Sequence, residues 1–184
     1  MHPQDSPKLM GMAKSIFALP WVEIASHSFS HPFFWQQADK KLYAFEAEPF
    51  GIKIPNYRFN LDTEITGSVD FINKNLAPPN KKCHLFFWSG LSEPSQHALA
   101  LTYQNNLLNI NGNSASITDN FPSLTGIRPM GFELGGYYQV FAPISLDFYY
   151  MNGFSGPLYG YEKVIETLKL TDKPHRFKPI DLYY

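Results

Sequence analysis

The sequence predicts an α/β fold, because segments with strand character alternate with segments with helix character along its 184 residues. This length suits one domain with a sizeable hydrophobic core. Such alternation favours parallel strands joined by crossover helices, so the expected architecture is a barrel or partial barrel of the (β/α) type. In barrels of this kind, functional residues follow the carboxyl ends of the strands.

The first elements are predicted from apolar spacing and from proline. Residues 1–8 are polar and are expected to be disordered. The spacing of Met10, Ala13 and Phe17 predicts the end of a helix, which Pro20 follows. Residues 21–26 then predict a short buried strand, and a loop is expected from residue 27 to about 34.

An irregular connection and a helix follow. Residues 39–60 have weak periodicity and several prolines, which favours an irregular connection. We expect Asp62 or Thr63 to cap a helix at its N-terminus. The apolar stripe of this helix consists of Ile65, Val69, Ile72 and Leu76.

The rest of the chain continues the alternation. Strands are predicted over residues 84–88, 107–110, 138–141 and 177–184, and helices over residues 94–102 and 161–170.

Composition excludes several classes of function. The net charge is −1 and no basic cluster is present, so neither nucleic acid nor an anionic membrane is an expected partner. No apolar run is long enough to span a membrane. The single cysteine, Cys83, rules out a disulfide within the chain and is interpreted as a small buried residue. A Gly-x-Ser-x-Gly motif is absent, so serine-hydrolase chemistry has no support.

The most informative motif is the pair His27 and His31, which directly follows a predicted buried strand. Two imidazoles four residues apart reach one ion when the backbone curls in a turn, and neutral imidazole suits zinc and similar divalent metals. Pro32 disfavours helical geometry at His31, so the pair belongs to a loop. Ser28 and Ser30 are candidates to orient the two rings. The alternative interpretation is a pair of surface or hydrogen-bonded histidines.

Other candidates each have two interpretations. Trp35 and Trp88 either stack on a sugar ring or pack in an aromatic core; aromatic residues make up 16% of the chain. Glu64 at the start of a helix is either a favourable partner of the helix dipole or a cleft-lining acid. Asp147 is either a spare carboxylate or a solvated loop acid. Three further histidines are interpreted as a core or edge residue, an exposed helix residue and a loop residue: His84, His97 and His175.

Residues 23–32, which hold both histidines, resemble the second motif of the NodB-type polysaccharide deacetylases. In that motif the two histidines bind the catalytic metal. Further segments, in order, are similar to the deacetylase domains of PelA-like proteins from bacterial Pel exopolysaccharide systems. These segments are residues 64–69, 76–78, 88–90, 109–112, 122–125, 139–143 and 156–160.

The resemblance implies a distorted (β/α) barrel and a periplasmic, metal-dependent hydrolase that removes N-acetyl groups from an amino-sugar polysaccharide, in biofilm exopolysaccharide production. It implies a divalent metal, zinc or cobalt, held by His27 and His31. The metal would activate water, a carboxylate would act as base and a histidine as acid. Asn111, which lies in one of these similar segments, joins Trp35 and Trp88 as a candidate substrate-binding residue. Other exopolysaccharide secretion proteins are the implied partners.

Several family positions are absent from this sequence. The family has an Asp pair upstream of the histidines, one acting as base and the other as third metal ligand; here the only upstream aspartate is Asp5, in a poor context. Leu91 stands where PelA-like domains tend to have Asp. We therefore expect residues 9–184 to form a partial deacetylase-like domain, truncated at both ends, without a complete catalytic set. The alternative is a non-catalytic carbohydrate-binding or scaffold module that kept the barrel.

Overall fold

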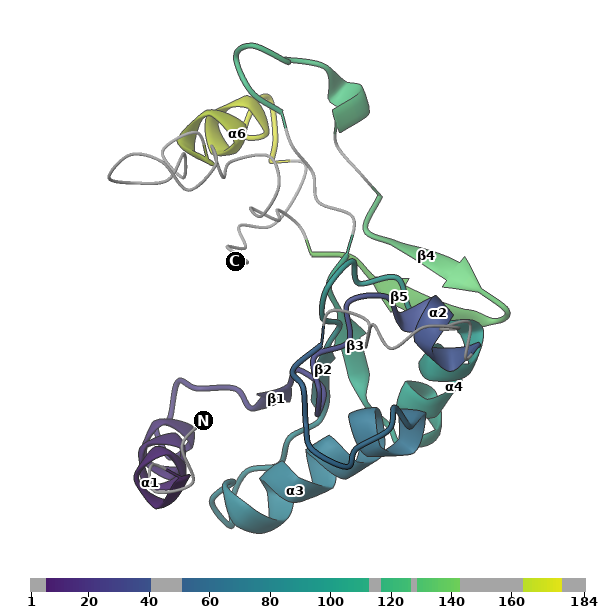
Figure 1. Cartoon of the computed structure of the whole chain (residues 1–184). Coiled ribbons are helices and arrows are strands. Elements are labelled where there is room, and N and C mark those ends of the chain that lie inside the picture. The colour runs from purple at the N-terminus through teal and green to yellow at the C-terminus, as the bar shows by residue number, and fades with distance from the viewer. Residues whose placement is uncertain (1–5, 41–50, 113–116, 127–128, 143–163, 177–184) are drawn as a thin grey trace. The chain divides into compact units, whose positions relative to one another are not determined.

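The computed structural model describes residues 6–40, 51–112, 117–126, 129–142 and 164–176, and it has a mixed α/β fold (Figure 1). Five strands form one sheet in the order β1-β2-β3-β5-β4, and β1, β2 and β3 are mutually parallel. The α/β class is therefore confirmed. Within the described ranges the sheet is open, so the predicted barrel or partial barrel is not confirmed.

The chain divides into two compact units, residues 1–110 with 134–137, and residues 111–133 with 138–184. The first unit holds the elements α1 (Ser6–Phe17), β1 (Ala25–Ser26), α2 (Trp35–Asp39), the π-helical turn η2 (Thr63–Gly67), α3 (Ser68–Asn75), β2 (Leu85–Phe87), α4 (Gln96–Gln104) and β3 (Leu108–Ile110).

In the second unit lie a short 3-10 turn, η3 (Leu124–Gly126), and the helix α6 (Val164–Leu170). The hairpin strands β4 (Gly131–Leu134) and β5 (Tyr137–Val140) have residues in both units. Gly135 and Gly136 join these strands with φ angles of 60° and 84°. Two consecutive positive φ angles are typical of a tight hairpin turn, and only glycine adopts them without strain.

The core of the first unit is aromatic. Trp35, Phe86 and Trp88 are almost fully buried and contact one another edge to face, with ring centroids 4.9 to 5.9 Å apart. Phe86 and Trp88 lie two residues apart, so they point to the same face of the sheet. Each indole N–H has an acceptor: Trp35 donates to the Ser89 carbonyl (3.1 Å) and Trp88 to the Asn109 side chain (3.0 Å). These bonds satisfy the polar atoms that burial would otherwise leave unpaired.

The early predictions are partly correct. The helix ending at Phe17 is confirmed, but it begins at Ser6, so the prediction of disorder is wrong for residues 6–8. The predicted strand over residues 21–26 is reduced to Ala25–Ser26, because Trp21 is 78% exposed rather than buried. The helix after the irregular connection is confirmed, but its cap is Asn60, whose side chain accepts from the Thr63 amide (2.9 Å). Asp62 already has helical angles.

Several later elements agree with the sequence. The strands near residues 84–88, 107–110 and 138–141 are confirmed, each with shifted ends. The helix predicted from residue 94 begins after Ser95, whose hydroxyl accepts from the Ala98 amide (3.0 Å). The described part of the helix predicted over 161–170 is α6. The predicted strand over 177–184 lies outside the described residues. The described helices include none that is long and apolar enough to cross a membrane.

Candidate functional site

The histidine loop begins at the carboxyl end of β1. Ser26, the last residue of β1, pairs with Phe86 of the parallel strand β2, so the next residues, His27 and Phe87, are neighbours. His27 Nδ1 lies 3.0 Å from the Phe87 carbonyl oxygen. A carbonyl only accepts, so Nδ1 carries the proton in this bond and the lone pair of neutral His27 is on Nε2. A backbone carbonyl fixes the tautomer of many metal-binding histidines in this way.

The His31 ring lies beside the His27 ring. Their centroids are 4.9 Å apart and the ring planes are inclined by 71°. A Zn–N bond of about 2.0 Å and a nitrogen-to-centroid distance of about 1.1 Å put two rings that share an ion at a tetrahedral angle about 5 Å apart. The observed distance fits a shared ion. It is also an ordinary edge-to-face distance, so it permits a shared ion without requiring one.

The backbone of the loop has an uncommon conformation. Ser28 and His31 have φ angles of 72° and 56°, in the left-handed region that L-residues seldom adopt. The Ser28 hydroxyl accepts from the His31 amide (3.1 Å) and thereby closes the turn. In the interactions of the described residues, both serines bind groups other than the imidazoles, so the predicted role of Ser28 and Ser30 in orienting the rings is replaced by a role in shaping the backbone.

The loop is also tied to the segment that follows β2. Ser89 Oγ donates to the Pro32 carbonyl (2.7 Å), and the Leu91 amide donates to the Phe33 carbonyl (3.0 Å). A Cβ at Gly90, which has a φ of 60°, would lie 2.3 Å from the Phe33 backbone. Glycine at this position therefore allows the two loops to approach each other closely.

Glu64 holds the middle of the histidine loop. Its side chain is fully buried, and Oε2 accepts from the backbone amides of Phe29 (2.9 Å) and Ser30 (2.8 Å). Oε1 accepts from the Ser30 hydroxyl and from the Tyr57 hydroxyl, the latter at 2.7 Å. From the sequence, Glu64 was expected to be either a partner of the helix dipole or a cleft-lining acid, and this bracing role was not predicted. The only signal in the sequence was an acid next to the apolar stripe of a helix.

Electrostatics favour the neutral imidazole at His27. Burial lowers its pKa below the usual value of 6.5, the hydrogen bond to Phe87 opposes this effect, and the charge on His31 adds to the lowering. His27 is therefore mostly neutral at pH 7, the form that binds metals. Burial and then the bond to Glu64 raise the pKa of Tyr57, so its hydroxyl stays protonated and remains a donor.

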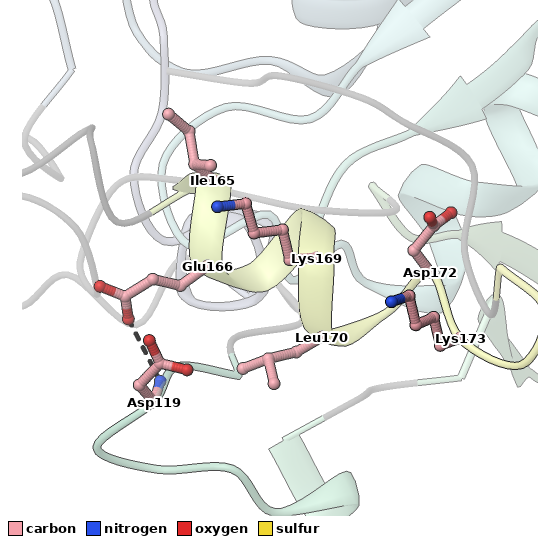
Figure 2. Close-up of a pocket in the computed structure, with 7 residues that line it drawn as sticks. All are labelled: Asp119, Ile165, Glu166, Lys169, Leu170, Asp172 and Lys173. Carbon is pink, nitrogen blue, oxygen red and sulfur yellow. Dashed lines mark hydrogen bonds between the residues drawn. The ribbon is translucent and has the colours of Figure 1, made fainter.

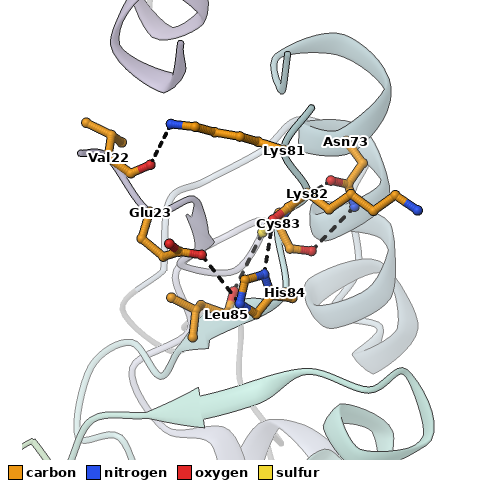
Figure 3. Close-up of polar contacts among 8 residues, drawn as sticks. All are labelled: Val22, Glu23, Asn73, Lys81, Lys82, Cys83, His84 and Leu85. Carbon is orange, nitrogen blue, oxygen red and sulfur yellow. Dashed lines mark hydrogen bonds and ion pairs between the residues drawn. The ribbon is translucent and has the colours of Figure 1, made fainter. Parts of the chain in front are cut away.

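Among the described residues, no third candidate ligand lies with the two histidines. They contain no group of three His, Cys, Asp or Glu side chains that could hold one ion. His84 directly precedes β2, whereas His27 lies beside Phe87 at the other end of that strand, and His84 pairs with Glu23 at 3.4 Å (Figure 3). His97 pairs with Asp39 at 3.3 Å, and His175 is exposed in a bend. Structural zinc sites use four protein ligands and catalytic ones three, so this pair alone would hold an ion weakly.

The three residues proposed to contact a sugar are all buried. Trp35 and Trp88 are 1% and 0% exposed, so the structure favours core packing over stacking on a sugar. Asn111 is 3% exposed, and its carbonyl accepts from the Gln139 side chain at 2.8 Å. Asp147 lies outside the described residues. Cys83 is buried as expected, and burial raises the pKa of its thiol to about 11.

A pocket of about 520 Å³ lies in the second unit along α6 (Figure 2). Its lining carries both signs of charge, and Glu166 accepts from the Asp119 amide at 3.1 Å. None of the candidate site residues lines it; the lining residues are Asp119, Ile165, Glu166, Lys169, Leu170, Asp172 and Lys173.

Comparison of the chain with protein-family models, curated proteins and solved structures gives no match.

Proposed function

We propose that His27 and His31 are two ligands of a divalent metal, zinc or cobalt, in a polysaccharide N-deacetylase that acts on an amino-sugar polymer in the periplasm. One observation carries this proposal. His27 donates from Nδ1 to the Phe87 carbonyl and has its Nε2 lone pair available, next to a second imidazole at the carboxyl end of a parallel strand. This arrangement supplies one oriented imidazole nitrogen on His27, with a second imidazole beside it, where functional residues of α/β proteins gather.

The chemistry divides between the ligands and further groups. When bound, the metal supplies Lewis acidity toward an amide carbonyl and a bound water of lowered pKa. His27 and His31 fix its position, and the burial of His27 keeps that imidazole unprotonated at neutral pH. Amide hydrolysis also needs a base and an acid, each worth about 10² to 10⁴-fold in rate. Glu64, the carboxylate that contacts the histidine loop, already accepts from four donors, so we propose that the described residues provide only part of the catalytic set.

A second candidate is a non-catalytic carbohydrate-binding or scaffold module with the same fold. It is favoured by the absence of a third ligand among the described side chains. In that case the histidine loop would serve the structure through its bonds to Phe87 and Glu64. A module of this kind would retain the polymer without releasing acetate.

Acetate release from a partly acetylated amino-sugar oligomer tests the proposal. Protein from the full natural reading frame is assayed with added cobalt, alongside the 184-residue chain. We expect acetate release from the former only, and loss of that release in His27→Ala but not in the matched control His84→Ala. Release that persists in His27→Ala would contradict the proposal. Polymer binding without any release would favour the binding module.

A further inference from the structure

We infer that Glu64 is the positioning residue of the histidine loop: its carboxylate sets the backbone conformation that brings the His27 and His31 rings together. The link to metal binding rests on the proposed function, whereas the claim about ring position does not. Glu64 lies 33 or more positions from either histidine in the chain, so this role follows from the fold.

The contacts of Glu64 fall between the two histidines. The amides of Phe29 and Ser30 point at the same oxygen, Oε2, at 2.9 and 2.8 Å. Two successive N–H groups aimed at one acceptor fix the orientation of the peptide planes on both sides of Phe29. Because Ser28 and His31 flank this pair with positive φ angles, the carboxylate holds a backbone conformation that these residues seldom adopt alone.

The position of Glu64 is itself fixed. It lies in the π-helical turn η2, a local departure from α-helix that is frequent at functional sites. The next turn, which begins α3, is bound to β1 because Ser68 Oγ lies 2.6 Å from Ser26 Oγ. Ser26 immediately precedes His27, so Glu64 and His27 are both held in position by the same strand, β1. Tyr57 braces the second carboxylate oxygen at 2.7 Å.

The hydrogen bonds of Glu64 predict different effects for an apolar and a polar substitution at this position. In Glu64→Met the chain keeps its length, but the amides of Phe29 and Ser30 lose their acceptor. In Glu64→Gln, Oε1 can accept from both amides while the amide nitrogen donates to the hydroxyls of Ser30 and Tyr57, since hydroxyls also accept. Glutamine should therefore retain the loop and methionine should release it. Ile65→Ala, on the same turn and fully buried, is the control for general destabilisation.

The first measurement uses the full 184-residue chain without metal, well below its unfolding temperature. We expect nuclear Overhauser contacts between the His27 and His31 ring protons in the wild type, in Glu64→Gln and in Ile65→Ala. We expect them to be lost in Glu64→Met, together with at least 10-fold faster exchange of the Phe29 and Ser30 amides. Ring contacts and slow exchange that persist in Glu64→Met would overturn the inference. If Glu64→Met does not fold, the double variant Tyr57→Phe with Ser30→Ala replaces it, because this variant removes both hydroxyl donors to Glu64. The same ring contacts should be weaker in the double variant, and unchanged contacts would overturn the inference.

Cobalt binding, followed by visible absorption, is the second measurement. We expect Glu64→Met to bind cobalt about 10 to 100-fold more weakly than the wild type, as is typical when an outer-shell partner is lost, and Glu64→Gln to stay close to the wild type. Equal affinity in all variants would overturn the positioning role in metal binding. If the wild type binds no cobalt while its ring contacts still depend on Glu64, the proposed function fails and the inference about ring position stands.

Discussion

Lys81 is expected to hold the end of α1 against the rest of the first unit. Its ammonium donates to the backbone carbonyls of Phe17 (3.1 Å), Val22 (2.9 Å, Figure 3) and Leu19. Helix α1 has no buried residue of its own, and only Phe17 packs against the core. A cation at the carboxyl end of a helix also complements the helix dipole. The attachment of α1 therefore depends strongly on this one side chain.

Lys81→Met should loosen α1 without unfolding the core. A hydrogen bond to a charged group contributes about 1.5 to 3 kcal/mol. Lys81 is only half-buried and water can replace it at the freed carbonyls, so we expect a total loss of about 2 kcal/mol for the three bonds. That energy increases the open population of α1 about 30-fold.

Trypsin cleavage after Lys14, within α1, measures the opening. When the helix opens and closes faster than it is cut, the cleavage rate follows the open population. We expect cleavage about 30-fold faster in Lys81→Met than in Lys82→Met. Lys82→Met is the control because it also removes one trypsin site, but its side chain is exposed. Equal rates in the two variants would refute the reasoning.

Three further predictions concern the first unit. The Cys83 thiol, with a pKa of about 11, should react with iodoacetamide at pH 8.5 more than about 10-fold more slowly in the folded chain than in urea; equal rates would contradict its burial. Because the pKa of His27 is lowered in the folded state, the unfolded state binds more protons below about pH 6.5. The free energy of unfolding, measured in urea, should therefore fall as the pH drops from 7.5 to 5.5. In His27→Gln this free energy should fall less steeply over the same pH range. Trp88→Phe removes a buried indole and its bond to Asn109 and should cost about 2 to 3 kcal/mol in urea unfolding, whereas Trp21→Phe, at a 78% exposed position, should cost less than about 0.5 kcal/mol.

The helices and strands that the sequence predicted share a clear local pattern. The stripe that begins at Ile65 has helical spacing, and Leu85–Phe87 is a compact apolar run. The helix α2 was missed because it has five residues, too few for a period to be recognised. Strand β4 was missed because its residues are exposed or half-exposed, so no buried face marks it. Openness of the sheet depends on contacts between distant strands, which local periodicity does not specify.

The candidate site was predictable only in part. His27 and His31 were recognisable because both their spacing and the preceding strand are local. The partners that orient the loop lie far along the chain: Phe87 is 60 residues from His27, and Glu64 is 35 residues from Phe29. The sheet register brings the first partner to its histidine, and the packing of η2 brings the second to the loop. Asn60 caps the helix in place of Asp62 or Thr63, because the helix begins two or three residues earlier than the apolar stripe suggested.

Zinc titration by calorimetry tests the central claim most directly. The chain is titrated at pH 7.5, where His27 is neutral, alongside His27→Ala, His31→Ala and the control His97→Ala, a histidine exposed on α4. We expect one zinc per wild-type chain, unchanged binding in the control, and at least about 10-fold weaker binding in each of the other two variants, since two ligands share the ion. Zinc binding that is the same in all four proteins would show that His27 and His31 are not the metal ligands.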